Sequence, residues 1–213
     1  MDLGDAISWP TRDPRWLGKC LLIGLIGLIP ILGGIAIFGW MYATLDNLRA
    51  GRSVLADAGF PQLARGARLF VVQLAYVAVS VVLVLLTLVP ALLVATGRSA
   101  GGALVALPLV LLGQALMLAY QLAFYVIFVP IILAVDRGGV GAGLDLPALW
   151  RAIRPRLPDT LLAGLMTVVA LLLGSLGVFL CVIGIIFTIP YGYAILAAVV
   201  HGYERDSTLG SAV

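Results

Sequence analysis

The charged side chains of this sequence lie outside its long apolar stretches. Residues 20–45, 69–97, 99–135 and 160–203 contain no Asp, Glu, Lys or Arg. Carriers that move ions or protons typically keep at least one such residue inside the membrane, because the transport pathway must accommodate charge. The pattern therefore argues against an ion-coupled or proton-coupled transporter.

The remaining residues that could do chemistry are few and scattered. His201 is the only histidine and lies at the end of the last apolar stretch, where a helix C-terminus favours an imidazole without any catalytic role. A lone histidine excludes metal sites built on histidine pairs. Cys20 and Cys181 lack the spacing of metal ligands or of a disulfide framework. We expect no catalytic site, no metal and no cofactor, and hence a protein that is not an enzyme.

Uncharged polar residues recur at helical spacing on two neighbouring apolar stretches. An amide that faced lipid unpaired would cost several kcal/mol, about 4–8 by transfer to an alkane, so these faces should contact protein or water. Two interpretations remain open, namely hydrogen bonds between helices and a polar lining for a solute or lipid-headgroup path. The candidate stripe comprises Gln73, Tyr76, Ser80, Gln114, Gln121 and Tyr125, with Thr87 on the first of the two faces.

The composition indicates that the elements carrying these residues lie in a membrane. Hydrophobic residues make up 62% of the chain and charged residues 11%, and mean hydropathy is +1.15, whereas soluble proteins carry about 25% charged residues. The net charge of +3 is too weak and too scattered for nucleic-acid binding. We predict an all-α, polytopic membrane helical bundle forming one domain over residues 1–213, with the lipid bilayer as its main partner.

The lengths of the apolar stretches predict about six membrane segments arranged as three hairpins. Residues 160–203 would form a helix of roughly 65 Å, about twice the hydrocarbon thickness, so the chain must fold back near Gly174, Gly177 and Gly184. A Gly-rich connection, residues 96–102, joins the middle pair. The predicted segments are 17–30, 34–48, 69–95, 103–134, 160–180 and 184–202.

The first apolar stretch allows two topologies. It forms either one tilted helix or two short helices broken at Pro30–Gly34, and the latter hairpin could be re-entrant because each arm is shorter than a full span. With the hairpin, all 13 basic residues except Arg98 fall on one side, as the positive-inside rule favours for cytoplasmic loops. This predicts a multi-pass protein of the inner (plasma) membrane with both termini cytoplasmic.

Three segments that start with an apolar residue and proline precede the hairpins and form a weak internal repeat. They are residues 9–16, 60–68 and 146–157, predicted as short interfacial amphipathic helices. The candidate interfacial anchors are Trp16, Arg65, Arg68, Trp150, Arg151 and Arg154. Small residues spaced by four predict close helix packing, and these are Ala170, Gly174, Ala194, Ala198 and Gly202.

Several short motifs are distributed along the chain, namely Asp13-Pro14-Arg15-Trp16-Leu17, Gly39-Trp40, Arg49-Ala50-Gly51, Phe60-Pro61 and Tyr191-Gly192-Tyr193. Together they resemble an uncharacterised prokaryotic membrane family known as domain of unknown function 4013. Trp40 departs from the usual tyrosine, and the helix after it is less basic than in most members. The resemblance implies a multi-helix membrane fold and no particular activity.

The favoured function is that of a non-enzymatic membrane protein, either structural or an accessory subunit that packs against another membrane protein or a second copy. One alternative is a passive small-solute or lipid permease lined by the glutamine stripe. Another is a membrane-shaping hairpin protein, suggested by the short first hairpin. The N-terminus lacks a basic region followed by a cleavage site, so no removable signal peptide is expected.

Overall fold

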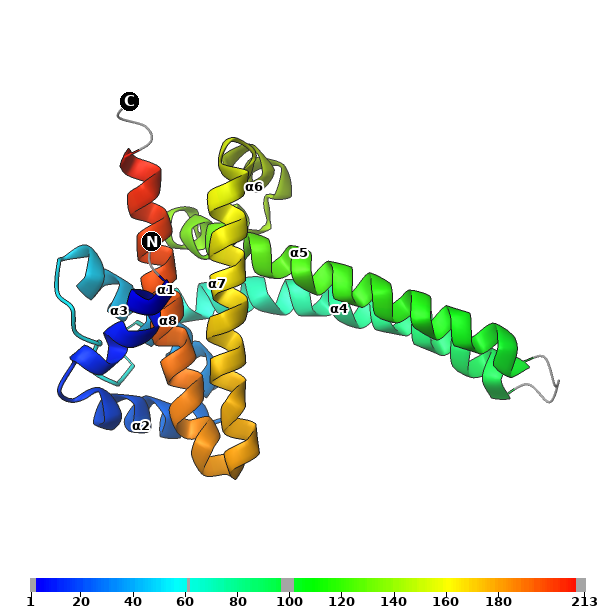
Figure 1. Cartoon of the computed structure of the whole chain (residues 1–213), viewed down its shortest axis with the longest axis horizontal. Coiled ribbons are helices and arrows are strands. Elements are labelled where there is room, and N and C mark those ends of the chain that lie inside the picture. The colour runs from blue at the N-terminus through cyan, green and yellow to red at the C-terminus, as the bar shows by residue number, and fades with distance from the viewer. Residues whose placement is uncertain (1–2, 61, 97–101, 210–213) are drawn as a thin grey trace. The chain divides into compact units, whose positions relative to one another are not determined.

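The computed structural model describes residues 3–60, 62–96 and 102–209, and this part of the chain consists of helices and their connections, with no strand (Figure 1). The all-α class predicted from the sequence is therefore confirmed. Four stretches are long and apolar enough to cross a membrane. They are Leu63–Val94, Ala106–Leu144, Leu146–Val178 and Gly184–Asp206.

The N-terminal region consists of short helices that double back on themselves. It comprises α1 (Leu3–Ser8), the 3-10 helix η1 (Trp9–Arg12), α2 (Trp16–Gly27) and α3 (Leu32–Arg49). Between α2 and α3 the amide of Leu32 donates to the carbonyl of Pro30 at 2.7 Å, and Ile31 has φ 65° and ψ −58°. This is a γ-turn of the rare, strained type, so the chain reverses at Pro30 at the cost of one unfavourable residue.

Helix α3 lies at the centre of the apolar core. Its middle turns, from Ala36 to Tyr42, are buried throughout, and Trp40 joins a cluster with Trp9, Cys20 and Leu55. The segment after α3 folds back over this cluster, and the Trp40 indole holds it there by donating to the carbonyl of Ala56 at 2.9 Å. A chain reversal on each side of α3 thus brings residues 9–23 and 55–56 together.

Helices α4 (Leu63–Thr96) and α5 (Gly102–Leu144) are the longest in the chain. The described chain divides into two compact units: one comprises residues 1–71 and 125–213, and the other residues 72–124. We call these the main unit and the helical pair. Gly139 in α5 has φ 75° and ψ −163°, a conformation available essentially only to glycine, and it bends the helix near its end. The predicted connection with Arg98 (residues 97–101) lies outside the described residues.

The helical pair consists of the distal part of α4 and the proximal part of α5, which run antiparallel. Gly113 allows their close approach, because a Cβ atom there would lie 2.6 Å from the Cβ of Thr87. Most of the remaining surface is apolar and exposed: in α4, only 6% of the most apolar stretch is buried. The pair therefore has one buried seam and an apolar exterior.

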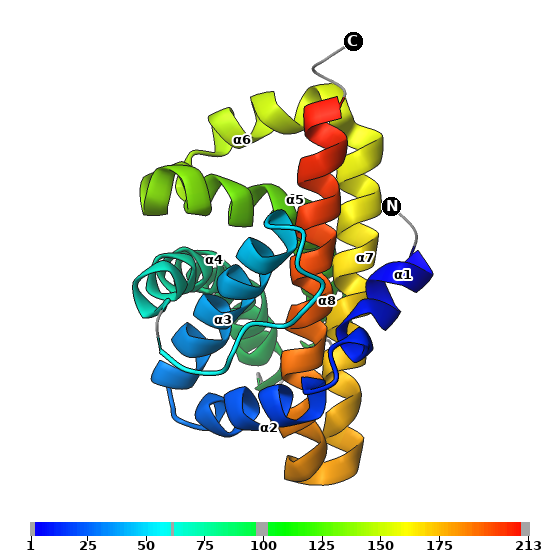
Figure 2. The same cartoon turned by 90° about the vertical axis from the view of Figure 1, so that its left-hand side faces the viewer.

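The C-terminal part of the main unit is a second helical hairpin. After α6 (Leu146–Ile153) and the 3-10 helix η2 (Arg154–Arg156), α7 (Leu157–Ser175) leads through η3 (Leu176–Leu180) into α8 (Cys181–Leu209). Figures 1 and 2 show α7 and α8 lying along each other. The chain thus folds back at the glycine-containing stretch where the sequence predicted a turn. Helix α2 crosses α8 (Figure 2), and a Cβ atom on Gly24 would overlap the Ile186 backbone.

Candidate functional site

The predicted polar stripe is partly used for contacts within the helical pair. The Tyr120 hydroxyl donates to the carbonyl of Tyr76 at 2.7 Å, and the Ser80 hydroxyl donates to the same carbonyl at 3.3 Å. The rings of Tyr76 and Phe124 lie 5.2 Å apart. Tyr76 and Ser80 of the stripe thus take part in packing between the two helices. The hydroxyl that bonds across to Tyr76 belongs to Tyr120, a residue that the sequence did not point to.

The three glutamines of the stripe differ in how far they are buried. Gln114 is exposed, whereas Gln121 and Gln73 are half-buried, and the Gln73 side-chain oxygen has no hydrogen-bond partner. Tyr125 belongs to the main unit, not to the helical pair. The structure thus leaves the proposed solute path as a prediction.

The small residues predicted for helix packing contact two different neighbours. Ala170 and Gly174 of α7 face Gly192 of α8, where a Cβ atom would lie 2.7 Å from the Ala170 carbonyl oxygen. The Thr188 hydroxyl donates to the carbonyl of Gly174 at 2.6 Å across the same seam. Ala194 and Ala198 face the other way, into the core beside α2 and α3, and Gly202 borders a pocket.

The predicted anchors take different positions. Trp16 packs against Tyr191 with ring centroids 5.8 Å apart. On α6, Leu149 and Ile153 are buried while Trp150 is 57% exposed, as expected for a short helix with one apolar face. The basic residues Arg68, Arg151 and Arg154 are exposed. Residues 63–68 are the first turns of α4 rather than a separate helix, and Arg65 is drawn into the interior of a charge cluster.

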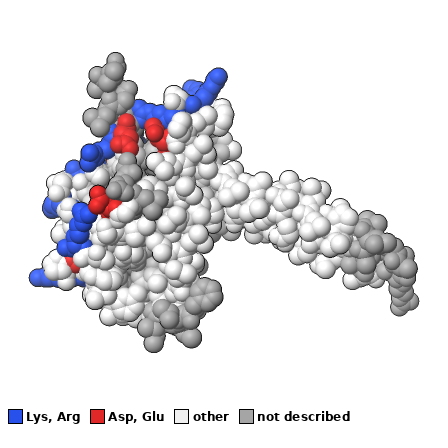
Figure 3. All heavy atoms as spheres, viewed as in Figure 1, with Lys and Arg blue, Asp and Glu red and all other residues white. Residues whose placement is uncertain are grey.

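That cluster joins four helices of the main unit and is the most developed polar arrangement in the described chain. We call it the ion-pair cluster, and it consists of Asp46 and Arg49 of α3, Arg65 of α4, Asp136 and Arg137 of α5, and Glu204 of α8. Figure 3 shows acidic and basic side chains gathered on this unit, while residues 72–96 and 102–124 carry none. Each member comes from near the end of an apolar helical stretch.

Asp136 is the centre of the ion-pair cluster. Its side chain is only 8% exposed, and its two oxygens bind Arg49 Nη1 at 2.8 Å and Arg65 Nη2 at 2.6 Å. Arg65 Nε adds a bond of 3.1 Å to the same carboxylate. Charge-assisted bonds of this kind are about twice as strong as neutral ones. Asp136 therefore connects α3 and α4 to α5 through one side chain.

The flanking members extend the cluster to α8. Arg49 Nε binds Glu204 Oε2 at 2.8 Å, and Arg137 Nη2 binds Glu204 Oε1 at 2.7 Å. Beneath them, the Arg65 guanidinium lies 4.9 Å from the centre of the Tyr42 ring, in the range of a cation–π contact. The Tyr42 hydroxyl donates to the carbonyl of Ile132 at 3.0 Å.

A second polar site fixes the loop after α3 to the N-terminal segment. Asp13 is 2% exposed and accepts bonds from Lys19 Nζ at 2.9 Å and from the amide of Leu55 at 3.0 Å. Burial raises the pKa of Asp13, but the bonds from the Arg15 amide, Lys19 and the Leu55 amide outweigh it and hold the pKa below its ordinary value. Lys19 Nζ also donates to the Leu55 carbonyl at 2.6 Å.

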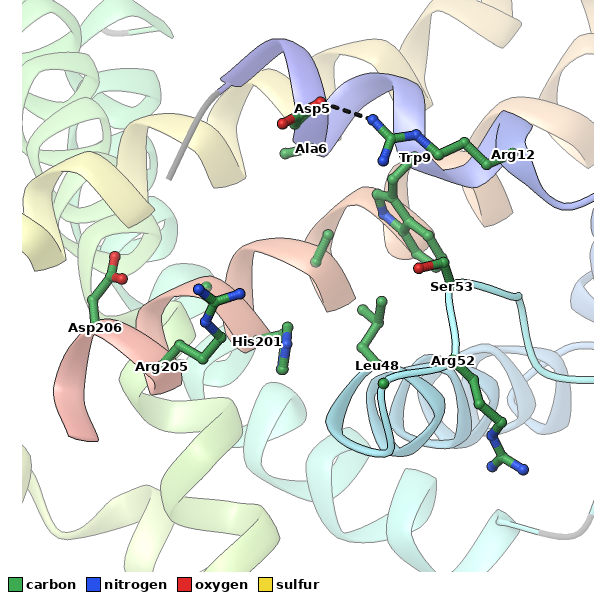
Figure 4. Close-up of a pocket in the computed structure, with 13 residues that line it drawn as sticks. Asp5, Ala6, Trp9, Arg12, Leu48, Arg52, Ser53, His201, Arg205 and Asp206 are labelled. Carbon is green, nitrogen blue, oxygen red and sulfur yellow. Dashed lines mark hydrogen bonds and ion pairs between the residues drawn. The ribbon is translucent and has the colours of Figure 1, made fainter. Parts of the chain in front are cut away.

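A pocket of about 530 Å³ lies in the main unit between the N-terminal helices and α8 (Figure 4). We call it the N-terminal pocket. Its polar lining includes Arg12, His201 and Arg205, and its apolar lining includes Trp9 and Leu48. Two nitrogen atoms at its border, Trp9 Nε1 and His201 Nδ1, are buried without a hydrogen-bond partner.

These arrangements differ in what they can do chemically. In the ion-pair cluster every side chain has an oppositely charged partner, so it is suited to holding helices together. No group of three or more His, Cys, Asp or Glu side chains in the described residues is placed to hold a metal ion. The N-terminal pocket, by contrast, has hydrogen-bonding capacity that the described chain does not use. The spacing of residues in the sequence indicated neither the ion-pair cluster nor the N-terminal pocket, because the members of each lie far apart in the chain.

The comparisons with known proteins bear on the whole chain. Neither the curated proteins nor the solved structures include a significant match. The model of one family, described as "Protein of unknown function (DUF4013)", matches residues 22–189. This is the family whose motifs the sequence resembles, and the match covers most of the chain, including α3, the helical pair, α7 and the first turns of α8. The chain therefore belongs to the DUF4013 family.

Proposed function

We propose that this protein is a multi-pass protein of the cytoplasmic membrane that has no catalytic activity and serves as an accessory subunit packing against another membrane protein. The helical pair carries this proposal. Its two helices bury one seam between them and leave large apolar side chains exposed on the remaining surface, such as Leu86, Leu93, Leu107 and Leu118. Lipid and a partner's helices are the two surroundings that suit such a surface.

The contrast with the α7–α8 hairpin supports this role. The most apolar stretches of Leu146–Val178 and Gly184–Asp206 are 39% and 56% buried within the chain, because α7 and α8 pack against each other and α8 also packs against α2 and α3. The chain itself thus supplies neighbours for α7 and α8. The helical pair has only its own seam and is the part best suited to contact another protein.

The use of charge supports a structural rather than a catalytic role. Each side chain of the ion-pair cluster is held by an oppositely charged partner from another helix or from its own. Catalytic groups, by contrast, are typically poised to exchange protons with a substrate. A cluster that ties α3, α4, α5 and α8 together holds the helices of the main unit to one another.

The chain reversal at Pro30 supports the proposed six-segment topology with both termini cytoplasmic. Because of it, Lys19 before the first hairpin contacts Leu55 after it, and Arg12 borders the same pocket as Arg52 and Arg205. A single crossing between residues 20 and 45 would separate these residues across a membrane about 30 Å thick. Helix α2 has only 12 residues, about 18 Å, so the hairpin enters the membrane without a full first span.

The experiment is site-specific photo-crosslinking in cells combined with affinity purification in a gentle detergent. A photoreactive residue replaces Leu86 or Leu118 in the helical pair, and a matched control replaces Leu161 or Leu165, which are more than half exposed on α7. We expect one protein to crosslink from the helical pair and to co-purify in a fixed ratio, with weaker crosslinks from α7. If the purified chain is a lone monomer and crosslinks only to lipid, the accessory role is refuted.

A further inference from the structure

The Trp9 indole presents a buried hydrogen-bond donor to the N-terminal pocket. Trp9 is 6% exposed, and its Nε1 atom has no partner. An indole nitrogen can only donate, and a buried donor left unpaired costs about 1–3 kcal/mol. Native structures keep few such groups, and each one calls for an explanation. A ligand that brings an acceptor to this atom explains it.

A second unpartnered nitrogen borders the same pocket from another element. His201 lies on α8, and its Nδ1 atom is buried without a hydrogen-bond partner. Figure 4 shows the nitrogen-bearing edge of the Trp9 ring turned toward the side on which His201 and Arg205 lie. Two unused nitrogens from segments almost two hundred residues apart therefore meet at one cavity.

The charges around the pocket favour an anion. Three arginines line it, Arg12, Arg52 and Arg205, against two acidic residues, Asp5 and Asp206. The Arg52 side chain points away from His201 and Arg205 in Figure 4 and donates to Asn47 Oδ1 at 2.6 Å. Arg12 binds Asp5 at 2.7 Å at the exposed rim, and in Figure 4 its guanidinium lies beside Trp9. Guanidinium groups match the geometry of phosphate oxygens and bind them through paired hydrogen bonds.

The size and floor of the pocket restrict the ligand further. About 530 Å³ lies within the range of small-molecule sites, about 300–1,000 Å³, and exceeds what a carboxylate alone would fill. Ala6, Leu48 and Ala198 supply an apolar wall beside the basic groups. A phosphate ester, with several acceptor oxygens and a less polar remainder, fits both surfaces.

We infer that the N-terminal pocket binds a phosphate-bearing anion, with the Trp9 N–H and the Arg12 guanidinium donating to its oxygens. The phosphate can belong to a small soluble ester or to the headgroup of a phospholipid, and the chemistry of recognition is the same. The inference is independent of the accessory role proposed above, since it concerns the main unit and not the helical pair.

The test is binding to the purified full-length chain in a lipid-free, phosphate-free detergent solution. The probes are inorganic phosphate, the short-chain phospholipid dihexanoyl phosphatidylglycerol, and dihexanoylglycerol, which lacks the phosphate. Isothermal titration gives the affinities. Indole labelling with ¹⁵N reports Trp9 directly, because its N–H resonance should shift when an oxygen accepts from it. Binding of both phosphate probes indicates that phosphate suffices, and binding of the phospholipid alone indicates a headgroup site; both results support the inference.

Variants locate the binding in the pocket. Trp9→Phe keeps an aromatic ring and removes the N–H donor, and Arg12→Gln removes the charge. Each should weaken phosphate binding about tenfold or more, since bonds to charged groups are the stronger class. Trp150→Phe and Arg151→Gln, both exposed on α6, are the matched controls and should change affinity less than twofold. The inference is overturned if neither phosphate probe binds, if dihexanoylglycerol binds equally well, or if the Trp9 and Arg12 variants, shown to be folded by circular dichroism, bind like the unaltered chain.

Discussion

Neutralising Asp136 is the sharpest test of how the helices of the main unit are held together. The substitution Asp136→Asn keeps the size of the side chain and removes its charge. It weakens the bonds to Arg49 Nη1 at 2.8 Å and to Arg65 Nη2 at 2.6 Å. The helices α3, α4 and α5 then lose a charged side chain that joins all three.

The magnitude follows from what remains after the change. Removing one partner of a fully buried ion pair costs about 3–5 kcal/mol, because the other charge stays buried and uncompensated. Here Arg49 retains Glu204 and Arg65 retains Asp46, and both guanidiniums are about a quarter exposed. The cost should therefore fall below that range, and we expect a loss of about 2–3 kcal/mol in the free energy of unfolding.

The assay is reversible unfolding in mixed micelles, followed by circular dichroism as the fraction of denaturing detergent rises. Asp57→Asn is the control, because that carboxylate is 95% exposed and contacts Lys19 at 3.4 Å, and exposed pairs contribute about 0–1 kcal/mol. A loss below 0.5 kcal/mol for Asp136→Asn, equal to that of the control, would refute the idea that this cluster holds the helices together.

Three further substitutions probe individual contacts, each by the same unfolding measurement. Gly66→Ala should cost more than about 2 kcal/mol, because its Cβ atom would overlap the carbonyl of Ile35 and lie 2.6 Å from the amide nitrogen of Gly39. The control Gly18→Ala, where nothing lies within 4 Å, should be neutral or stabilising. Equal effects of the two substitutions would contradict the close crossing of α3 and α4. Ile31→Gly should stabilise the chain or leave it unchanged, because glycine adopts the positive φ of 65° at this position without the strain of about 1–3 kcal/mol that isoleucine carries there. A clear loss in the free energy of unfolding would show that the turn is not strained. Asp13→Asn should cost about 2 kcal/mol at pH 7. Because the folded-state pKa of Asp13 is lowered, the carboxylate contributes its full stabilisation above the unfolded pKa of about 3.9 and loses it as pH falls through the folded pKa. The unfolding free energies of the variant and the unaltered chain should therefore converge only in acid. A constant difference between them from pH 7 to pH 2 would contradict this linkage.

Much of the fold follows from the sequence, because apolar length and turn residues act locally. The reversal at Pro30 and the fold-back between α7 and α8 fall in stretches where proline and glycine interrupt the apolar sequence. The helices themselves run past the apolar stretches. Helix α5 continues to Leu144, beyond the predicted end at 134, because tertiary contacts such as the ion pairs of Asp136 override the weak helix propensity of Asp and Gly.

The ion-pair cluster and the N-terminal pocket could not be predicted from local sequence patterns, because their contacts join residues that lie far apart in the chain. Arg65 was expected to anchor in the headgroup region, since a basic residue before an apolar helix usually faces water. Its pairing with Asp136 joins residues 71 positions apart and depends on how α4 and α5 pack in the main unit. The N-terminal pocket likewise unites Trp9 with His201. Helical periodicity constrains neighbours within one helix, and neither contact is of that kind.

All of these proposals rest on the claim that the chain is a membrane bundle whose charged helix ends share one side, opposite the connection near Arg98. Cysteine accessibility in intact cells tests this claim most directly. In a chain with Cys20→Ala and Cys181→Ala, single cysteines replace Ser53 or Ser99, and a thiol reagent that cannot cross membranes is added before or after permeabilisation. The account predicts that Ser99→Cys reacts in intact cells and Ser53→Cys only after permeabilisation. Reaction of both from the same side, in intact cells or only after permeabilisation, would contradict it.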